Sequence, residues 1–477
     1  MKINEFIEKI KNNEIDIVEH TQKVIDECKK INKEYNYLNI ISEDLALKQA
    51  KELHKKIKNK KDIKNKKLLG VAVSVKDSIC VKNVESAAGS RILKGYKPLF
   101  DATVIKKVKD AGGIIIGKTS QDEFGFGSFS VNVGLGFKVP KNPFDKERSC
   151  GGSSGGAAGL SQKASFPHVA LGESTGGSIV EPASFCGVFG LCPTYGRVSR
   201  YGLIDYANSL DKIGPLGKNT YDIASLLETI SGFDNNESTT INKPIDNYTE
   251  FVNNDKNNKL KIGIIKESFD DIDDKINKKI MEAIKKLEDS GTKIQEISLK
   301  LPIEQGLSTY YILATSEAST NLAKYCGMRY GISDKLEGNF NEYFTKVRGH
   351  DLGQEAKRRI ILGTFARMSG YRDAYYIKAT KVRAKIVNEY KKMFKKFDVL
   401  ISPTAPILSP KFSEIEKLSL LQQYMMDIMT VSPNVAGLPH MNVPVGFENN
   451  LPVGMLMISD HLQESKLVQL GSVMENN

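Results

Sequence analysis

Two glycine-rich turns hold the residues of this sequence that are best suited to chemistry. They are Gly151–Gly156 (Gly-Gly-Ser-Ser-Gly-Gly) and Thr175–Ser178 (Thr-Gly-Gly-Ser), and serine is the only nucleophile type in either turn. Glycines beside a serine let the backbone adopt positive φ angles and let a substrate approach the main chain. Successive N–H groups in such turns can point at one oxyanion. Because apolar residues flank both turns, they predict an acyl-transfer site rather than a flexible linker.

The serines need a base, and the sequence offers two kinds. The pattern Gly151-x-Ser153-x-Gly155 fits the nucleophile elbow of α/β-hydrolases, which requires a histidine. Lys76 instead ends a strand predicted over 69–77, where α/β sheets place their chemistry. A buried lysine can act as a base because desolvation favours its neutral form. We favour Lys76, with one serine as nucleophile and the other as proton bridge. The downstream histidines, none in a distinctive context, are His168, His350, His440 and His461.

A third motif is misleading. Gly112–Thr119 matches the phosphate-loop pattern G-x-x-x-x-G-K-[ST] letter for letter. Three of its four variable positions are isoleucine, which is stiff and favours a strand over a phosphate-wrapping turn. We therefore predict a strand at 114–116 and no nucleotide site. No metal site is predicted either, because the six histidines show no paired-ligand spacing.

Strand and helix patterns alternate along the chain, which predicts an α/β fold with a mixed sheet. Residues 1–65 are predicted to form a helical lead-in that packs on a main domain over 66–477, in which the polar segment 233–258 is an exposed loop. The predicted helices are three within 3–58 and one each at 101–111, 220–232, 272–290, 303–325 and 352–395. Further strands are predicted at 260–265, 293–299, 399–402 and 441–445.

Composition limits the class of protein. The chain has 477 residues, of which 40% are hydrophobic and 26% charged, and no apolar run approaches the roughly 20 residues needed to cross a bilayer. The first 16 residues alternate charge with isolated apolar residues, which predicts a helix rather than a signal peptide. We expect a cytoplasmic protein with no membrane contact. The net charge of +11 fits an RNA or phosphate-bearing partner, or a general bias toward lysine.

The reactive turns resemble those of a known family. Lys76, Gly151–Gly156 and Gly176–Ile179, followed by Pro182–Gly187, resemble the amidase signature family. The resemblance implies an α/β/α sandwich with a large mixed β-sheet flanked by helices, and a Ser-Ser-Lys triad. It makes Ser178 the acylated nucleophile, Ser153 the bridging serine after a cis peptide bond, and Lys76 the base. It also implies an oxyanion hole made by the backbone N–H groups of Thr175, Gly176, Gly177 and Ser178.

Further motifs stand at Asp122–Phe124, Pro193–Leu203, Ser209–Asp211, Ser316–Ser319, Arg358–Gly363 and Asn434–Pro439. They resemble those of the A subunits of tRNA-dependent amidotransferases. The resemblance implies a glutaminase that supplies ammonia for converting Glu-tRNA(Gln) to Gln-tRNA(Gln), Asp-tRNA(Asn) to Asn-tRNA(Asn), or both. It implies subunits B and C as partners, aminoacyl-tRNA bound through the complex, ATP and Mg on a partner, and no cofactor on this chain. A free-standing amidase for small amides is the alternative.

The same resemblance implies how glutamine is held. Arg358, or its neighbour Arg359, would pair with the α-carboxylate, because arginine binds carboxylates bidentately. Asp427 would pair with the α-ammonium, with Tyr310 or Tyr311 nearby. From the residues alone, a surface ion pair for Arg358 and a helix cap for Asp427 stay open.

Two positions depart from the commoner family pattern. Ser174 and Val180 stand where an aspartate and an arginine are usual. Both charges are missing together, so a supporting ion pair is expected to be replaced as a unit. Glu173 and Glu181 are the residues available to compensate.

Overall fold

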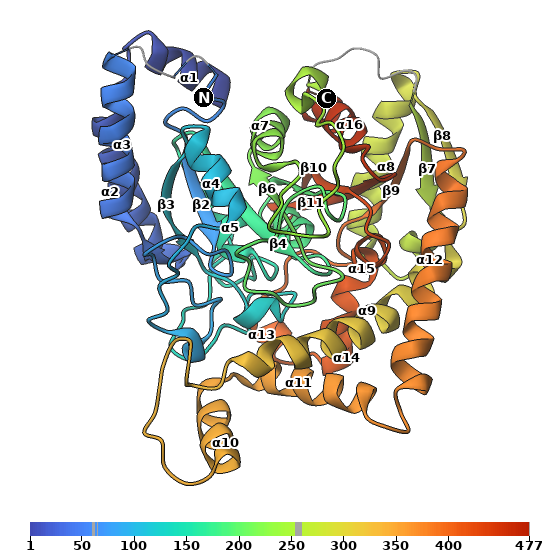
Figure 1. The fold of residues 1–477 in the computed structure, drawn as a ribbon. Coiled ribbons are helices and arrows are strands. Elements are labelled where there is room, and N and C mark those ends of the chain that lie inside the picture. Colours follow the sequence, from blue (N-terminus) through green and yellow to red (C-terminus); the bar gives the residue numbers. More distant parts are fainter. Residues whose placement is uncertain (60–62, 64, 253–259, 477) are drawn as a thin grey trace.

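The computed structural model describes residues 1–59, 63, 65–252 and 260–476, and its centre is one mixed sheet (Figure 1). The strand order is β1-β3-β2-β4-β6-β5-β10-β11-β9-β7-β8. Strands β3, β2 and β4 run parallel, as do β9, β7 and β8, and the other neighbours are antiparallel. The strands are β1 (Leu38–Ile41), β2 (Ala72–Lys76), β3 (Ile114–Thr119), β4 (His168–Ser174), β5 (Phe189–Cys192), β6 (Lys212–Gly217), β7 (Lys261–Ile265), β8 (Lys293–Ile297), β9 (Val399–Pro403), β10 (His440–Glu448) and β11 (Leu451–Ser459).

Helices cover both faces of this sheet. The chain moves from β2 through α4 to β3 in one direction along the sheet, and from β3 through α5 to β4 in the other. Since crossovers between parallel strands are right-handed, α4 and α5 lie on opposite faces, as the predicted α/β/α sandwich requires. The helices are α1 (Ile3–Lys11), α2 (Ile17–Tyr35), α3 (Glu43–Lys58), α4 (Thr103–Asp110), α5 (Gly155–Lys163), α6 (Val180–Phe185), α7 (Thr220–Ile230), α8 (Asp274–Asp289), α9 (Lys300–Asn321), α10 (Phe340–Asp351), α11 (Gln354–Arg367), α12 (Lys378–Phe394), α13 (Phe412–Ile415), α14 (Leu420–Met425), α15 (Val431–Val435) and α16 (Glu464–Asn476).

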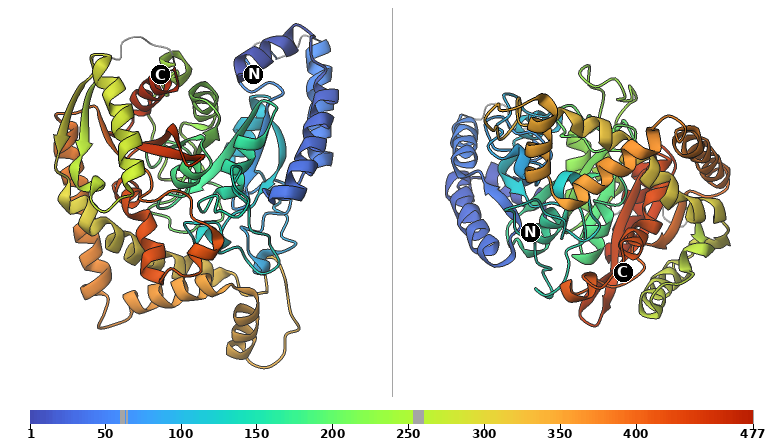
Figure 2. Two further views of the ribbon diagram at one scale, coloured as in Figure 1. Left: turned by 180° about the vertical axis from the view of Figure 1, so that it is seen from behind. Right: turned by 90° about the horizontal axis from the view of Figure 1, so that it is seen from below.

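The three predicted N-terminal helices form and lie at one end of the sheet (Figures 1 and 2). Helix α2 begins where the Asp16 carboxylate accepts two backbone N–H bonds, and it ends at Asn36 in the left-handed conformation. Phe6 and Ile10 of α1 are buried in the same apolar core as the sheet. The Ile3 N–H donates to Asp222 Oδ1 at 3.0 Å and so ties α1 to α7. A domain boundary near residue 65 stays a prediction.

The fold differs from the sequence prediction in several elements. The single helix predicted over 352–395 is wrong: α11 ends at Arg367 and α12 starts at Lys378, because Gly370 between them takes a φ of 88°. The prediction missed strands β1, β4, β5, β6 and β11 and helices α5, α6, α10, α13, α14, α15 and α16. Helix α10 projects below the body of the molecule (Figure 1). Of the segment 233–258, residues 253–258 lie outside the described part. The rest is not wholly exposed, since Tyr248 is buried.

None of the helices within the described ranges is long and apolar enough to span a membrane.

Candidate active site

Lys76 lies at the carboxyl end of β2, at the centre of a buried polar cluster. Its side chain is fully buried. The Nζ atom lies 2.7 Å from Ser153 Oγ, 2.8 Å from the Glu173 carbonyl oxygen and 2.9 Å from Glu173 Oε2. The predicted lysine and bridging serine are therefore in direct contact. Glu173, which the sequence offered only as a compensating charge, is a third member of this cluster.

The two serine turns pack against each other. The Ser154 N–H donates to the Ser178 carbonyl oxygen at 3.2 Å, and the Gly152–Ser153 peptide is cis, as the resemblance implies. A Cβ on Gly152 would lie 2.3 Å from Asp122 Oδ2, so this position requires glycine. Within the described chain, the Ser178 hydroxyl makes no hydrogen bond. It is thus free to react, and its relay to Ser153 stays a prediction.

The Thr175–Ser178 turn presents free N–H groups. No acceptor in the described residues receives a hydrogen bond from the backbone N–H of any of these four residues. Two of their carbonyl groups accept hydrogen bonds: the Asn434 amide donates to the Gly176 carbonyl, and the Glu181 N–H donates to the Gly177 carbonyl at 2.9 Å. Buried N–H groups without a partner are uncommon. This geometry suits an oxyanion hole.

The structure separates the two arginine candidates. Arg358 is one-third exposed and pairs with Glu355 on the surface of α11. Arg359 is buried, and its guanidinium donates to Glu355 Oε1 at 2.8 Å and to the Tyr206 hydroxyl at 2.6 Å. It is therefore Arg359 rather than Arg358 that faces the interior. Four aromatic rings lie within 6 Å of its guanidinium: Phe126, Tyr206, Tyr311 and Tyr424.

Asp427 and the two tyrosines lie between Arg359 and the serine turns. The Asp427 carboxyl accepts hydrogen bonds from the Ser128 hydroxyl and the Tyr311 hydroxyl, each at 2.8 Å. Burial raises the pKa of Asp427, and these hydrogen bonds oppose the rise. Tyr310 packs on the oxyanion turn, since a Cβ on Gly176 would lie 2.8 Å from its hydroxyl. The Asp427 side chain caps no helix here, so the helix-cap alternative is wrong.

Two further carboxyl groups line this interior. Asp122 accepts N–H bonds from Ser130 at 3.0 Å and Asn132 at 2.8 Å, and burial raises its pKa to about 6. Glu181 is fully buried, and its carboxyl group lies against that of Asp427, with which it can share a proton. Burial, and then the nearby Asp427 charge, raise the pKa of Glu181 well above its usual value. The site thus contains three buried carboxyl groups with raised pKa values, those of Asp122, Glu181 and Asp427.

The departures from the family pattern leave no ion pair where one is usual. Val180 is fully buried, and the Ser174 hydroxyl accepts a hydrogen bond from the Asn434 amide at 3.2 Å. Glu173, one residue before Ser174, instead carries the compensating charge to Lys76.

The alternative motifs have other uses in the fold. The isoleucines of Gly112–Thr119 lie in β3, and the buried Lys118 amine donates to Ser86 Oγ at 2.8 Å and to backbone carbonyls. No histidine contacts Ser153 or Ser178 in the described chain; His168, for example, bonds Ser74 at 3.0 Å. Burial lowers the pKa of His168 to about 3. A histidine-based elbow is therefore excluded among the described residues.

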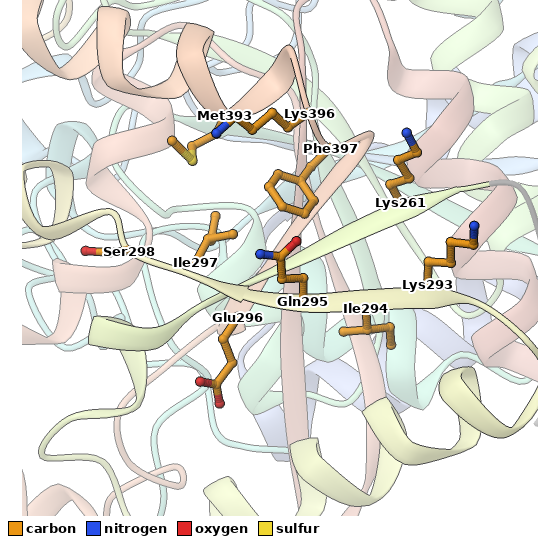
Figure 3. Close-up of a pocket in the computed structure, with 10 residues that line it drawn as sticks. All are labelled: Lys261, Lys293, Ile294, Gln295, Glu296, Ile297, Ser298, Met393, Lys396 and Phe397. Carbon is orange, nitrogen blue, oxygen red and sulfur yellow. The ribbon is translucent and has the colours of Figure 1, made fainter.

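A surface pocket of about 570 Å³ lies far from this cluster (Figure 3). It opens beside β8, at the opposite edge of the sheet from β2, and includes residues at the end of α12. Ser298 is the one hydroxyl among its lining residues, and it bonds Glu267. The Ser298 hydroxyl thus bonds a carboxylate rather than a lysine, and we place the candidate chemistry at the buried centre.

Comparison with known proteins agrees with the geometry. The family model described as Amidase matches residues 19–468. The A subunit of glutamyl-tRNA(Gln) amidotransferase from Thermoanaerobacter pseudethanolicus is 43% identical over 100% of this chain and 96% of its own length. The protein of the same name from Sulfurihydrogenibium sp. is 41% identical over 98% of this chain and 95% of its own.

Solved structures share the fold. That of the glutamyl-tRNA(Gln) amidotransferase A subunit from Thermotoga maritima has a TM-score of 0.80 and 34% identity, and covers 100% of this chain and 94% of its own. A bacterial aryl acylamidase has a TM-score of 0.85 over 100% of this chain and 96% of its own, at 21% identity, which indicates the fold alone. Since the family model and these relatives span nearly all of its length, the chain belongs to the amidase signature family.

Proposed function

We propose that this chain is the glutaminase subunit of a tRNA-dependent amidotransferase. Its full-length similarity to glutamyl-tRNA(Gln) amidotransferase A subunits supports this function. The observation that carries the chemistry is the 2.7 Å contact between a buried lysine, Lys76, and Ser153. This contact lies beside the Thr175–Ser178 turn, whose N–H groups have no acceptor in the described chain.

The proposed reaction is acyl transfer through Ser178. Its hydroxyl oxygen attacks the side-chain amide carbon of glutamine while its proton passes to Ser153, and the proton of Ser153 passes to the Lys76 amine. The oxyanion that forms is held by the N–H groups of the 175–178 turn. The proton returns from Lys76 through Ser153 to the amide nitrogen, the C–N bond breaks, and ammonia leaves. Water then hydrolyses the γ-glutamyl ester on Ser178 and releases glutamate.

Glutamine is held by its two charged ends. Arg359 binds the α-carboxylate, because its buried guanidinium is a fixed, bidentate donor among aromatic rings. Asp427 binds the α-ammonium and is linked to Arg359 through Tyr311, which touches both. Tyr310 fixes the oxyanion turn relative to this binding site.

The ammonia passes to a partner. Subunits B and C are the proposed companions, and aminoacyl-tRNA binds through the complex. ATP and Mg²⁺ act on one of these companions, and this chain needs no cofactor, because its triad activates the nucleophile by proton transfer alone. The complex works in the cytoplasm.

The test is a Ser178→Ala variant of the assembled complex. We expect glutamine-dependent amidation of Glu-tRNA(Gln) to disappear while amidation from added ammonia continues at the wild-type rate. Ser161→Ala, which alters a buried serine of α5 outside the cluster, is the matched control and keeps both activities. Loss of both activities in Ser178→Ala, or retention of both, would refute the assignment.

A further inference from the structure

Glu173 joins the base of the triad to a second group of buried carboxyls. Its side chain is only 3% exposed. One carboxyl oxygen lies 2.9 Å from Lys76 Nζ, and the other lies 2.9 Å from Thr175 Oγ1. The Thr175 hydroxyl also lies 2.8 Å from Asp211 Oδ1. A continuous hydrogen-bonded chain therefore runs from Ser153 through Lys76, Glu173 and Thr175 to Asp211.

The hydrogen count at Lys76 shows when Glu173 matters. An ammonium group has three N–H bonds, and Lys76 Nζ has three acceptors: Ser153 Oγ and two oxygens of Glu173. An amine has only two N–H bonds and one lone pair. When the lone pair faces the Ser153 hydroxyl, both N–H bonds still point at Glu173. Glu173 thus orients the amine before the proton arrives and stabilises the ammonium afterwards.

We propose that Glu173 is a positioning residue that extends the triad to Ser178-Ser153-Lys76-Glu173 and stabilises Lys76 as it gains the proton of Ser153. This inference rests on the proposed amide hydrolysis and adds a residue to it. A carboxylate that orients a base and stabilises its protonated form is a known device in serine hydrolases with a histidine base. Here it serves a lysine.

The Thr175 hydroxyl lies between the carboxyl groups of Glu173 and Asp211. The Thr175 hydroxyl has one proton and cannot donate to both Glu173 and Asp211. One of the two carboxyls must therefore carry a proton and donate to Thr175. Burial, and then the charge of Glu173, raise the pKa of Asp211 well above its usual value. The proton that the Thr175 geometry requires is accordingly assigned to Asp211.

Other titratable groups also face Lys76 and Glu173, and they stay in place when Glu173 alone is changed. Asp122 packs under the Ser153 turn from the segment before the 3₁₀ turn Glu123–Gly125, and Asp211 lies just before β6. Cys192 lies at the end of β5, and burial raises the pKa of its thiol. A difference between wild type and a Glu173 variant therefore reports on Glu173.

The test is the pH dependence of Ser178 labelling in the full chain. The probe is a fluorophosphonate, whose second-order rate of attachment to Ser178 is followed from pH 5 to pH 10. In Glu173→Gln the carboxamide keeps contacts to Lys76 and Thr175 but lacks the charge. We expect a labelling plateau about 10- to 100-fold below wild type, the cost of losing one charged hydrogen bond. We also expect the acid limb to move to lower pH, because the ammonium is no longer stabilised.

Controls separate a charge effect from a folding defect. Glu464→Gln changes a fully buried glutamate of α16 outside the cluster, and its profile should match wild type. If Glu173→Gln does not fold, Glu173→Ser removes the charge with less bulk, and the same two changes are expected. A lower plateau with an unmoved acid limb, or an unchanged profile, would overturn the proposal. If wild type itself neither labels at Ser178 nor hydrolyses glutamine, the proposed function fails instead.

Discussion

Replacing Glu123 by glutamine should make the protein more stable at neutral pH. Glu123 lies in the 3₁₀ turn Glu123–Gly125 and is 2% exposed. Its carboxyl accepts a hydrogen bond from Ser90 Oγ at 2.5 Å and from the Gly353 N–H at 2.8 Å. Gly353 precedes α11, so Glu123 holds the start of the helix that carries Arg359. Burial raises the pKa of Glu123 from its usual 4.5 to about 7, against the pull of these hydrogen bonds.

The sign and size of the effect follow from proton linkage. Below pH 4.5 Glu123 is protonated in both the folded and the unfolded chain, so it adds no pH dependence. Between pH 4.5 and about 7 the unfolded chain loses this proton while the folded chain keeps it. The free energy of unfolding therefore falls by up to about 1.4 kcal/mol per pH unit, about 3 kcal/mol over the window. Above pH 7 the loss is complete. Glutamine cannot ionise, and its amide can accept from Gly353 and donate to Ser90.

The assay is urea unfolding of wild type and Glu123→Gln at pH 4.5 and pH 7.5. We expect similar stability at pH 4.5 and an advantage of about 3 kcal/mol for the variant at pH 7.5. Glu52→Gln, at an exposed position of α3, should parallel wild type at both pH values. If Glu123→Gln and wild type lose the same free energy between the two pH values, burial does not hold the Glu123 proton and the reasoning is wrong.

Two substitutions in α11, Gly363→Ala and Arg359→Lys, are each paired with a control substitution. Gly363→Ala should destabilise the fold by about 3 kcal/mol in urea unfolding, because the new Cβ would lie 1.8 Å from the Thr315 carbonyl oxygen of α9. In the control Gly349→Ala, in α10, the new Cβ has no atom within 4 Å, and the free energy of unfolding should rise by about 0.5–1 kcal/mol. Equal effects at Gly363 and Gly349 would contradict the close packing of α11 on α9. Arg359→Lys should raise the KM for glutamine about 10- to 100-fold with a smaller change in kcat, since lysine lacks the bidentate fork. Arg358→Lys should change the KM for glutamine less than about twofold, because a surface ion pair contributes little. A larger effect would show that Arg358, and not Arg359, binds the α-carboxylate of glutamine.

The contact between Lys76 and Ser153 could be predicted from sequence because its signals are local. Glycines around Ser153 and Ser178 mark turns whose backbone chemistry depends on a few neighbouring residues. Lys76 ends an apolar strand, and strand ends in α/β sheets meet at one edge. The structure places Lys76 and Ser153 2.7 Å apart. The isoleucines of β3 were recognised in the same way, because β-branched residues favour strands.

The choice between Arg358 and Arg359 could not be made from local pattern, since neighbours on a helix point about 100° apart and only packing decides which is buried. One usable signal was the four-residue spacing of Glu355, Arg359 and Gly363, which puts all three on the inner face of α11. The break at Gly370 also had a signal, because glycine is a poor helix former. Neither signal was used in the prediction.

Glu173 marks the limit of sequence reasoning. Its role depends on β4 lying beside β2, where Val75 pairs with Leu171, and on β6 on the other side of β4. The β2–β4 pairing joins segments almost a hundred residues apart and the β4–β6 pairing joins segments about forty residues apart, and no local pattern specifies either. Once they form, a carboxylate at position 173 has Lys76 as its nearest cation, whereas position 174 meets Asn434. The negative charge that is absent at Ser174 is thus present one residue earlier, at Glu173, where it pairs with Lys76. Glu173 therefore pairs with the proposed base, Lys76, whereas the usual aspartate at position 174 would pair with an arginine at position 180.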